Sequence, residues 1–145
     1  MKINNSNEFG RLPIIELVDF EKENGISLPE DYRAFLLEHN GGVPSPNEIP
    51  DPSNIVTYIL GMHNGEYYAS IYKHIDMFKH RLPFSTFPIA TDPFGNLFIM
   101  SVHPEGLGHI YFWDHEQEPP FQDGSYTENT YFVAESFSEF LQSLR

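Results

Sequence analysis

The sequence predicts an α+β fold with a central, mostly antiparallel sheet of about five strands, flanked by N-terminal, middle and C-terminal helices. Two observations carry this prediction. Short runs rich in β-branched and aromatic residues follow one another over residues 87–113, joined by short turns, which is typical of antiparallel pairing. Helical spacing of apolar residues occurs only near the two ends and in one middle segment. The 145 residues suit one domain, in which residues 1–10 are expected to form a loose N-terminus.

Two helices are expected in the first forty residues. Pro13 suits a first helical turn, apolar residues recur at helical spacing over residues 14–18, and Asn24-Gly25 supplies a stop. In the second helix, Ser27 and Glu30 have capping-box spacing. Its apolar stripe and its stop comprise Leu28, Tyr32, Phe35, Leu36, Asn40, Gly41 and Gly42.

The middle of the chain alternates between loops, strands and one helix. The prolines of residues 43–54 indicate an irregular loop, and residues 55–60 read as a strand. Apolar residues at intervals of three and four predict a helix over residues 68–82, which Pro83 ends. Four further strands are expected over residues 87–90, 97–102, 109–113 and 131–134, with a tight turn at 93–96.

The last two segments are a loop and a helix. Residues 114–129 are polar and acidic, and they predict a long exposed loop. Ser136 and Glu139 have the spacing of a capping box that starts a C-terminal helix. The apolar stripe of this helix includes Phe137, Phe140 and Leu141.

Composition excludes several classes of protein. There is no cysteine, which excludes disulfides, thiolate metal sites and thiol nucleophiles. The formal net charge is −13, and residues 82–144 contain no Lys or Arg, so direct binding of nucleic acid is not expected. No apolar run approaches the roughly 18 residues of a membrane span, and no secretory signal is visible. A cytoplasmic protein without membrane contact is expected.

Four segments resemble a known group of proteins. They are residues 28–42 (LPEDYRAFLLEHNGG), 88–96 (PIATDPFGN), 108–115 (GHIYFWDH) and 134–141 (AESFSEFL). In this order they resemble the SUKH superfamily, which includes fungal cell-wall assembly regulators and many bacterial immunity proteins. The resemblance implies an α+β domain that binds a protein partner. Bacterial members resemble immunity proteins that hold a toxin domain, often a nuclease, inactive, and fungal members resemble scaffolds in signalling and wall assembly.

The motif residues have structural interpretations and, at a few positions, chemical alternatives. Asp92 either accepts backbone N–H groups in its own turn or acts as a general base or metal ligand, and no second carboxylate lies nearby in sequence. Asp114 and His115 are either an acid–base pair or neighbours that point to opposite faces. Trp113 is expected to be a core or interface anchor. The motif residues are Leu28, Pro29, Tyr32, Phe35, Leu36, Asn40, Gly41, Gly42, Asp92, Gly95, Asn96, Trp113, Ser136, Phe137, Phe140 and Leu141.

The seven histidines form none of the familiar metal-binding motifs, and no phosphate- or dinucleotide-binding fingerprint is present. We therefore expect no metal, no cofactor and no catalytic residue. The acidic loop is either a solvated segment or a surface for a basic partner, with aromatic anchors among carboxylates. Its candidate partner-binding residues are Asp114, Glu116, Glu118, Phe121, Asp123, Tyr126 and Glu128.

Three hypotheses for function follow from the sequence. The first is a non-catalytic immunity-type protein that neutralises a cognate toxin domain, expected to be a basic nuclease, through its acidic surface. The alternative is a protein-interaction scaffold or regulator, for example in cell-wall assembly signalling, without a toxin partner. The third is an enzyme that uses Asp92, Asp114 or His115, which requires their side chains to converge in one pocket.

Overall fold

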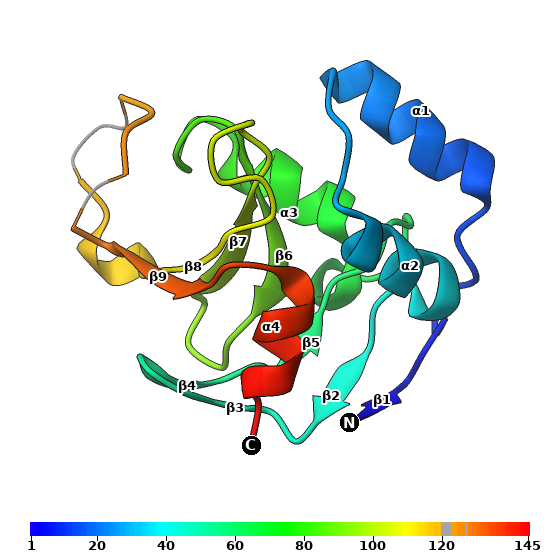
Figure 1. Ribbon diagram of the computed structural model, residues 1–145, viewed down its shortest axis with the longest axis horizontal. Helices are drawn as coiled ribbons and strands as arrows, with labels where there is room; N and C mark the ends of the chain where they lie inside the picture. The colour runs from blue at the N-terminus through cyan, green and yellow to red at the C-terminus, as the bar shows by residue number, and fades with distance from the viewer. Residues whose placement is uncertain (120–122, 127) are drawn as a thin grey trace.

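The computed structural model describes residues 1–119, 123–126 and 128–145, and within these ranges it confirms the α+β class. A five-stranded antiparallel sheet forms the centre of the molecule (Figure 1). Its order is β5 (Tyr58–Ile59), β6 (Thr86–Thr91), β7 (Leu97–Ser101), β8 (Ile110–Trp113) and β9 (Thr130–Ala134). The described helices are α1 (Ile14–Asn24), α2 (Glu30–His39), α3 (Ile71–Phe78) and α4 (Phe137–Ser143). Strands β6 to β9 confirm the four strands predicted over residues 87–134 to within one residue. Of the strand predicted over residues 55–60, only Tyr58–Ile59 joins the central sheet.

The N-terminal part of the chain contains more strand than the sequence predicts. The expectation of a loose N-terminus is wrong for β1 (Lys2–Asn4), which pairs antiparallel with β2 (Val43–Ser45). The predicted loop also contains β3 (Glu48–Pro50), which pairs with β4 (Ser53–Ile55). Each pair is a two-stranded ribbon, in which a proline is tolerated where its position requires no N–H donor. Prolines in the sequence indicate a loop, which hid both ribbons. The partner of β1 lies about forty positions away, whereas β3 and β4 are adjacent in the chain.

The ends of the first two helices follow the prediction better than their beginnings. Gly25 and Asn40 adopt the left-handed conformation at the C-caps of α1 and α2. The predicted capping box of Ser27 and Glu30 is wrong, because α2 begins at Glu30 with Pro29 as an N-cap that provides no side-chain hydrogen bond.

The starts of α3 and α4 are set by serine caps. The hydroxyl of Ser70 accepts a hydrogen bond from the Lys73 N–H (3.2 Å), so α3 begins after the short 3-10 turn η1 (Tyr67–Ala69) rather than at residue 68. Ser136 caps α4 as predicted, and its hydroxyl accepts a hydrogen bond from the Glu139 N–H at 3.1 Å.

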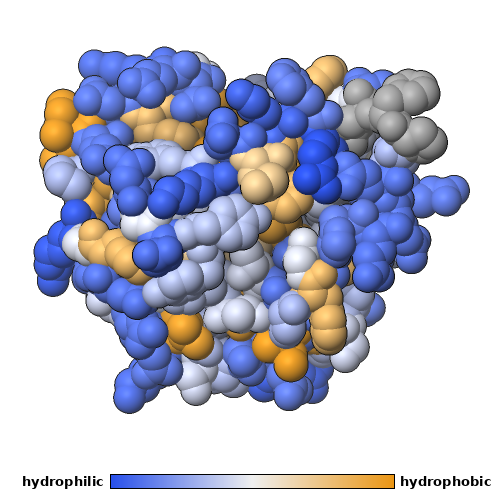
Figure 2. All heavy atoms as spheres, turned by 180° about the vertical axis from the view of Figure 1, so that it is seen from behind, coloured by the Kyte–Doolittle hydropathy of each residue, from blue (hydrophilic) through white to orange (hydrophobic). Residues whose placement is uncertain are grey.

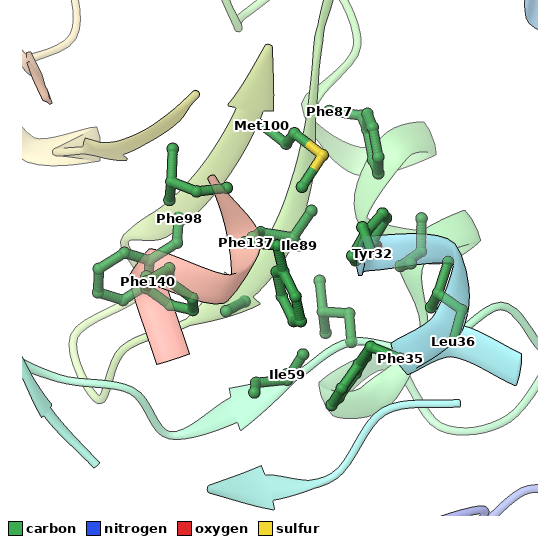
Figure 3. Packing of buried hydrophobic residues seen from close by; sticks show 14 of the residues in the cluster. Tyr32, Phe35, Leu36, Ile59, Phe87, Ile89, Phe98, Met100, Phe137 and Phe140 are labelled. Atoms are coloured by element: carbon green, nitrogen blue, oxygen red, sulfur yellow. The ribbon is translucent and has the colours of Figure 1, made fainter. Parts of the chain in front are cut away.

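The main core lies between one face of the sheet and helices α2 and α4. Figure 3 shows aromatic side chains of both helices pointing toward residues of β6 and β7. The rings of Tyr32 and Phe137 lie 5.0 Å apart, and those of Phe98 and Phe140 lie 5.5 Å apart. Aromatic pairs at these separations add to the stabilisation that burial alone provides. The second face of the sheet carries a smaller cluster formed by Phe78, Leu97, Ile99 and Trp113.

The motif at residues 40–42 joins the end of α2 to the centre of the fold. Asn40 is 4% exposed, and its side-chain N–H₂ group donates to the carbonyls of Gly10 (3.0 Å) and Met62 (3.1 Å). Its side-chain oxygen accepts from the Met62 N–H at 2.8 Å. A Cβ on Gly41 would lie 2.7 Å from the Ile59 carbonyl oxygen, so only glycine fits between α2 and β5.

A stack of rings fixes α3 against the sheet. The His74 ring is 2% exposed and lies between Tyr67 (4.2 Å between centroids) and Phe78 (6.2 Å). Its Nδ1 lies 2.9 Å from the Ser70 carbonyl oxygen. Burial lowers the pKa of His74, because the charged imidazolium is poorly solvated there.

This burial predicts loss of stability in acid. Below about pH 6.5 the unfolded chain binds a proton at His74 that the folded chain does not. The free energy of unfolding therefore decreases as the pH is lowered. We expect urea midpoints to decrease from neutral pH toward pH 5, and the decrease to be smaller in His74→Gln. Equal pH slopes for the two proteins would show that His74 does not contribute.

Candidate functional site

The acidic loop connects β8 to β9, and Figure 1 shows its first described turn, residues 115–117, at the edge of the molecule beside β8 and β9. It begins with the short 3-10 turn η2 (His115–Gln117). Glu116, Asp123 and Glu128 are exposed, whereas Asp114 and Glu118 are partly buried. Phe121, which the sequence places among the partner-binding candidates, lies outside the described residues. Three of the five carboxylates of the loop are therefore exposed.

Glu118 is paired within the protein. Its two carboxylate oxygens accept hydrogen bonds from Nε (2.9 Å) and Nη2 (2.7 Å) of Arg81. The guanidinium carbon lies 4.6 Å from the Phe78 ring centroid and 5.7 Å from that of Trp113. Bidentate pairing with stacking is the strongest arrangement available to arginine, and it raises the pKa of Arg81. Glu118 therefore anchors the loop, and its charge is largely compensated by Arg81.

Two more carboxylates shape the loop locally. The carboxylate of Asp114 accepts from the Glu116 N–H at 3.0 Å and starts η2. Asp123 accepts from both the N–H (2.9 Å) and the hydroxyl (2.6 Å) of Ser125, and these hydrogen bonds lower the pKa of Asp123. At the base of the loop, the buried side chain of Asn129 donates to the Asp114 carbonyl at 3.0 Å. These contacts hold the described parts of the loop in a defined shape.

An aromatic strip borders the loop on the same sheet face as Trp113. The Tyr111 ring lies 4.8 Å from that of Tyr126 and 5.7 Å from that of Phe132. Tyr126 is 43% exposed and Phe132 is 51% exposed. We call Tyr111, Tyr126 and Phe132 the aromatic strip. Sequence analysis identified only Tyr126, because Tyr111 and Phe132 meet through the register of β8 with β9.

The Asp92 turn has the structural form that the sequence favours. One oxygen of the Asp92 carboxylate accepts from the N–H groups of Phe94 and Asn96, each at 2.8 Å. The other oxygen accepts from the side-chain amides of Asn96 (2.9 Å) and Asn54 (3.0 Å). Asp92 is 5% exposed, and its carboxylate accepts these four hydrogen bonds, three from its own turn and one from Asn54. This geometry supports the turn interpretation over that of a general base.

The neighbouring Asp114 and His115 also form hydrogen bonds with nearby residues of the protein. The His115 N–H donates to the Asn96 side-chain oxygen at 2.9 Å, and His115 Nε2 lies 2.8 Å from the Phe94 carbonyl oxygen. Trp113 is completely buried, which makes it a core residue rather than an interface anchor. The imidazole thus closes over the Asp92 turn, while the Asp114 carboxylate caps η2.

Comparison with known proteins places the chain in a family. The sequence profile of the SMI1 / KNR4 family (SUKH-1) matches residues 13–143. The chain belongs to the SMI1 / KNR4 family. It is also similar to the SPbeta prophage-derived uncharacterized protein YokK of Bacillus subtilis (strain 168), with 29% identity over 160 aligned positions. The alignment covers 93% of this chain and 78% of that relative.

Membership of the SMI1 / KNR4 family confirms the resemblance drawn from the four motif segments, all of which lie within the matched residues. The structure gives most motif residues a place in the core or in a turn, as at Asn40 and Asp92. Among the described residues, no three His, Asp or Glu side chains gather as a metal site would require. In the same part of the chain, no helix is long and apolar enough to cross a membrane.

Sequence reasoning missed Arg81 at this site. Arg81 is the last base before the base-free residues 82–144, and it reaches the loop only through the fold. Its position at the end of α3, close to the strand that carries Trp113, could not be read from local patterns.

Proposed function

We propose that this chain is a non-catalytic, immunity-type protein. It binds a basic toxin domain, a nuclease, in a one-to-one complex. The observation that carries the proposal is that Glu116, Asp123 and Glu128 are exposed on the loop that also carries Tyr126 of the aromatic strip. The family includes proteins of this type, and the similar prophage-derived protein of Bacillus subtilis favours the bacterial branch of the resemblance.

The proposed mechanism is occupation of the partner's phosphate-binding surface. A nuclease holds its substrate with Lys and Arg, and the same cations are attracted to exposed carboxylates. The exposed rings of Tyr126 and Phe132 supply the apolar anchors that interfaces concentrate near their centre. Bound in this way, the protein would block substrate both sterically and by neutralising charge.

The test is capture of the partner followed by an inhibition assay. The tagged full chain is used in a pull-down from its native cell at low and at high salt, and the captured domain is then purified. We expect a basic nuclease whose activity on DNA or RNA is lost at one equivalent of this protein. A structural or signalling partner, or no partner, would contradict the proposal and favour the scaffold hypothesis.

A further inference from the structure

A hollow in the surface lies beside the C-terminal ends of α1 and α3. Its volume is about 720 Å³, and we call it the α1–β6 groove. Its walls are residues 24–26, 79–80, 82–88 and 102–104, with Phe20 and the α3 residues Ile75 and Phe78 below. In Figure 2 the upper edge of the molecule is notched between the α1 side and the side with grey residues, and apolar side chains show in the notch.

The floor of the groove is apolar. Phe20 and Phe87 are nearly buried beneath it, and their rings lie 6.0 Å apart. Ile75 and Val102 are partly exposed toward it, and Phe84 stands at the rim with 73% of its surface exposed. A concave apolar surface of several hundred Å³ with a few polar groups is the usual form of a small-molecule site.

The described lining of the groove contains no carboxylate, unlike the acidic protein as a whole. Its titratable lining residues are Lys79, His80 and His103, and no Asp or Glu belongs to the described lining. The whole chain carries 21 acidic and 8 basic residues, so a groove without a carboxylate stands apart from its surroundings. The Asp76 carboxylate lies 3.6 Å from Lys79 Nζ. Both side chains are largely exposed, and the attraction within such a solvent-exposed ion pair is weak.

The backbone at the rim has an uncommon conformation. His80 and Ser85 have φ angles of 68° and 58°, in the left-handed region that residues with a Cβ seldom adopt. These two residues bound the segment that carries Phe84. Left-handed residues of this kind recur at ligand sites, where surrounding contacts hold them. The Phe84 N–H donates to the Gly124 carbonyl at 2.9 Å, which fixes the rim.

We propose that the α1–β6 groove binds a small amphiphilic anion, with a flat apolar body on the floor and an anionic group beside Lys79 and His103. The aromatic side chains of the floor favour a ligand with an apolar body. Because the described lining contains Lys79 and no carboxylate, it favours a ligand with a negative charge. The rim of the groove touches the acidic loop at Gly124, but none of the loop's carboxylates belongs to the described lining, so the proposal does not rest on the proposed toxin partner.

The test compares two probes with nearly the same apolar body. 8-Anilinonaphthalene-1-sulfonate carries an anionic group, and N-phenyl-1-naphthylamine does not. We expect saturable one-to-one binding of the sulfonate to the native full chain with a Kd on the order of 100 μM, and at least about threefold weaker binding of the neutral probe. Amide chemical shifts of the labelled protein are expected to change around the groove.

Matched variants locate the two halves of the site. Lys79→Gln is expected to weaken sulfonate binding about two- to fivefold and to leave the neutral probe unchanged, whereas Lys73→Gln on the same helix changes neither. Asn24→Phe narrows the mouth and is expected to weaken both probes, whereas Glu23→Phe, one residue away on α1 and outside the lining, does not.

Several results would overturn the proposal. They are absence of saturable binding up to about 1 mM, chemical-shift changes centred elsewhere, or equal affinity for the two probes. Groove shifts that depend on protein concentration without any probe would instead assign the surface to a second copy of the chain. If Lys79→Gln binds the sulfonate as tightly as the native protein does, Lys79 does not contribute to anion binding and the proposed position of the anionic group is wrong.

Discussion

Replacing Asn40 with alanine is expected to lower the free energy of unfolding by about 3 to 5 kcal/mol. The substitution leaves the Met62 N–H and the carbonyl oxygens of Met62 and Gly10 without their side-chain partner in a buried place. It also puts alanine at a C-cap whose φ is 42°, where a Cβ is disfavoured. Both costs fall where α2, the N-terminal segment and β5 meet.

A second variant separates the side-chain effect from the backbone effect. Asn40→Gly loses the same hydrogen bonds but tolerates the left-handed φ, so it should be about 1 kcal/mol more stable than Asn40→Ala. Urea unfolding followed by the fluorescence of Trp113, the single tryptophan, gives both values. A loss below about 1 kcal/mol in both variants would show that water or backbone movement replaces these hydrogen bonds.

The sequence predicts best those elements whose signals are local. The predictions of the Asp92 turn and of the start of α4 are confirmed, because Asp92 and Ser136 contact backbone groups within four residues of themselves. The strands β6 to β9 follow one another along the chain, so short turns fix their order. In contrast, β1 pairs with residues about forty positions away, and no local pattern reports such a partner.

The same distinction governs the candidate site. The acidic composition of the loop is visible in the sequence, but the state of each carboxylate depends on contacts made elsewhere in the fold. Glu118 reads as one of several equal acids until Arg81, 37 positions earlier, is seen to bind it. The sequence places Phe132 in a predicted strand, but the position of β9 at the edge of the sheet and the 51% exposure of Phe132 come only from the structure. The sequence therefore predicts that the loop is negatively charged, whereas the structure shows which of its carboxylates and aromatic rings are exposed.

Reversing the charges of Glu116 and Glu128 is expected to slow association with the basic partner domain by about 10- to 100-fold at low salt. Both side chains are exposed, so lysine can replace them without burying charge. The affected quantity is the association rate, since exposed charges steer the encounter more than they hold the complex. The effect should shrink as salt shortens the screening length below about 10 Å.

A control pair separates local charge from net charge. Glu23→Lys with Glu48→Lys also changes exposed carboxylates and brings the formal net charge from −13 to −9, but these residues lie on α1 and β3. Stopped-flow association rates of the two double variants are compared over a range of salt concentrations. If the control slows as much as the loop variant, overall charge attracts the partner and the loop is a solvated segment. A loss confined to the loop variant places the encounter surface beside the aromatic strip, because Glu116 and Glu128 belong to the same loop as the exposed ring of Tyr126.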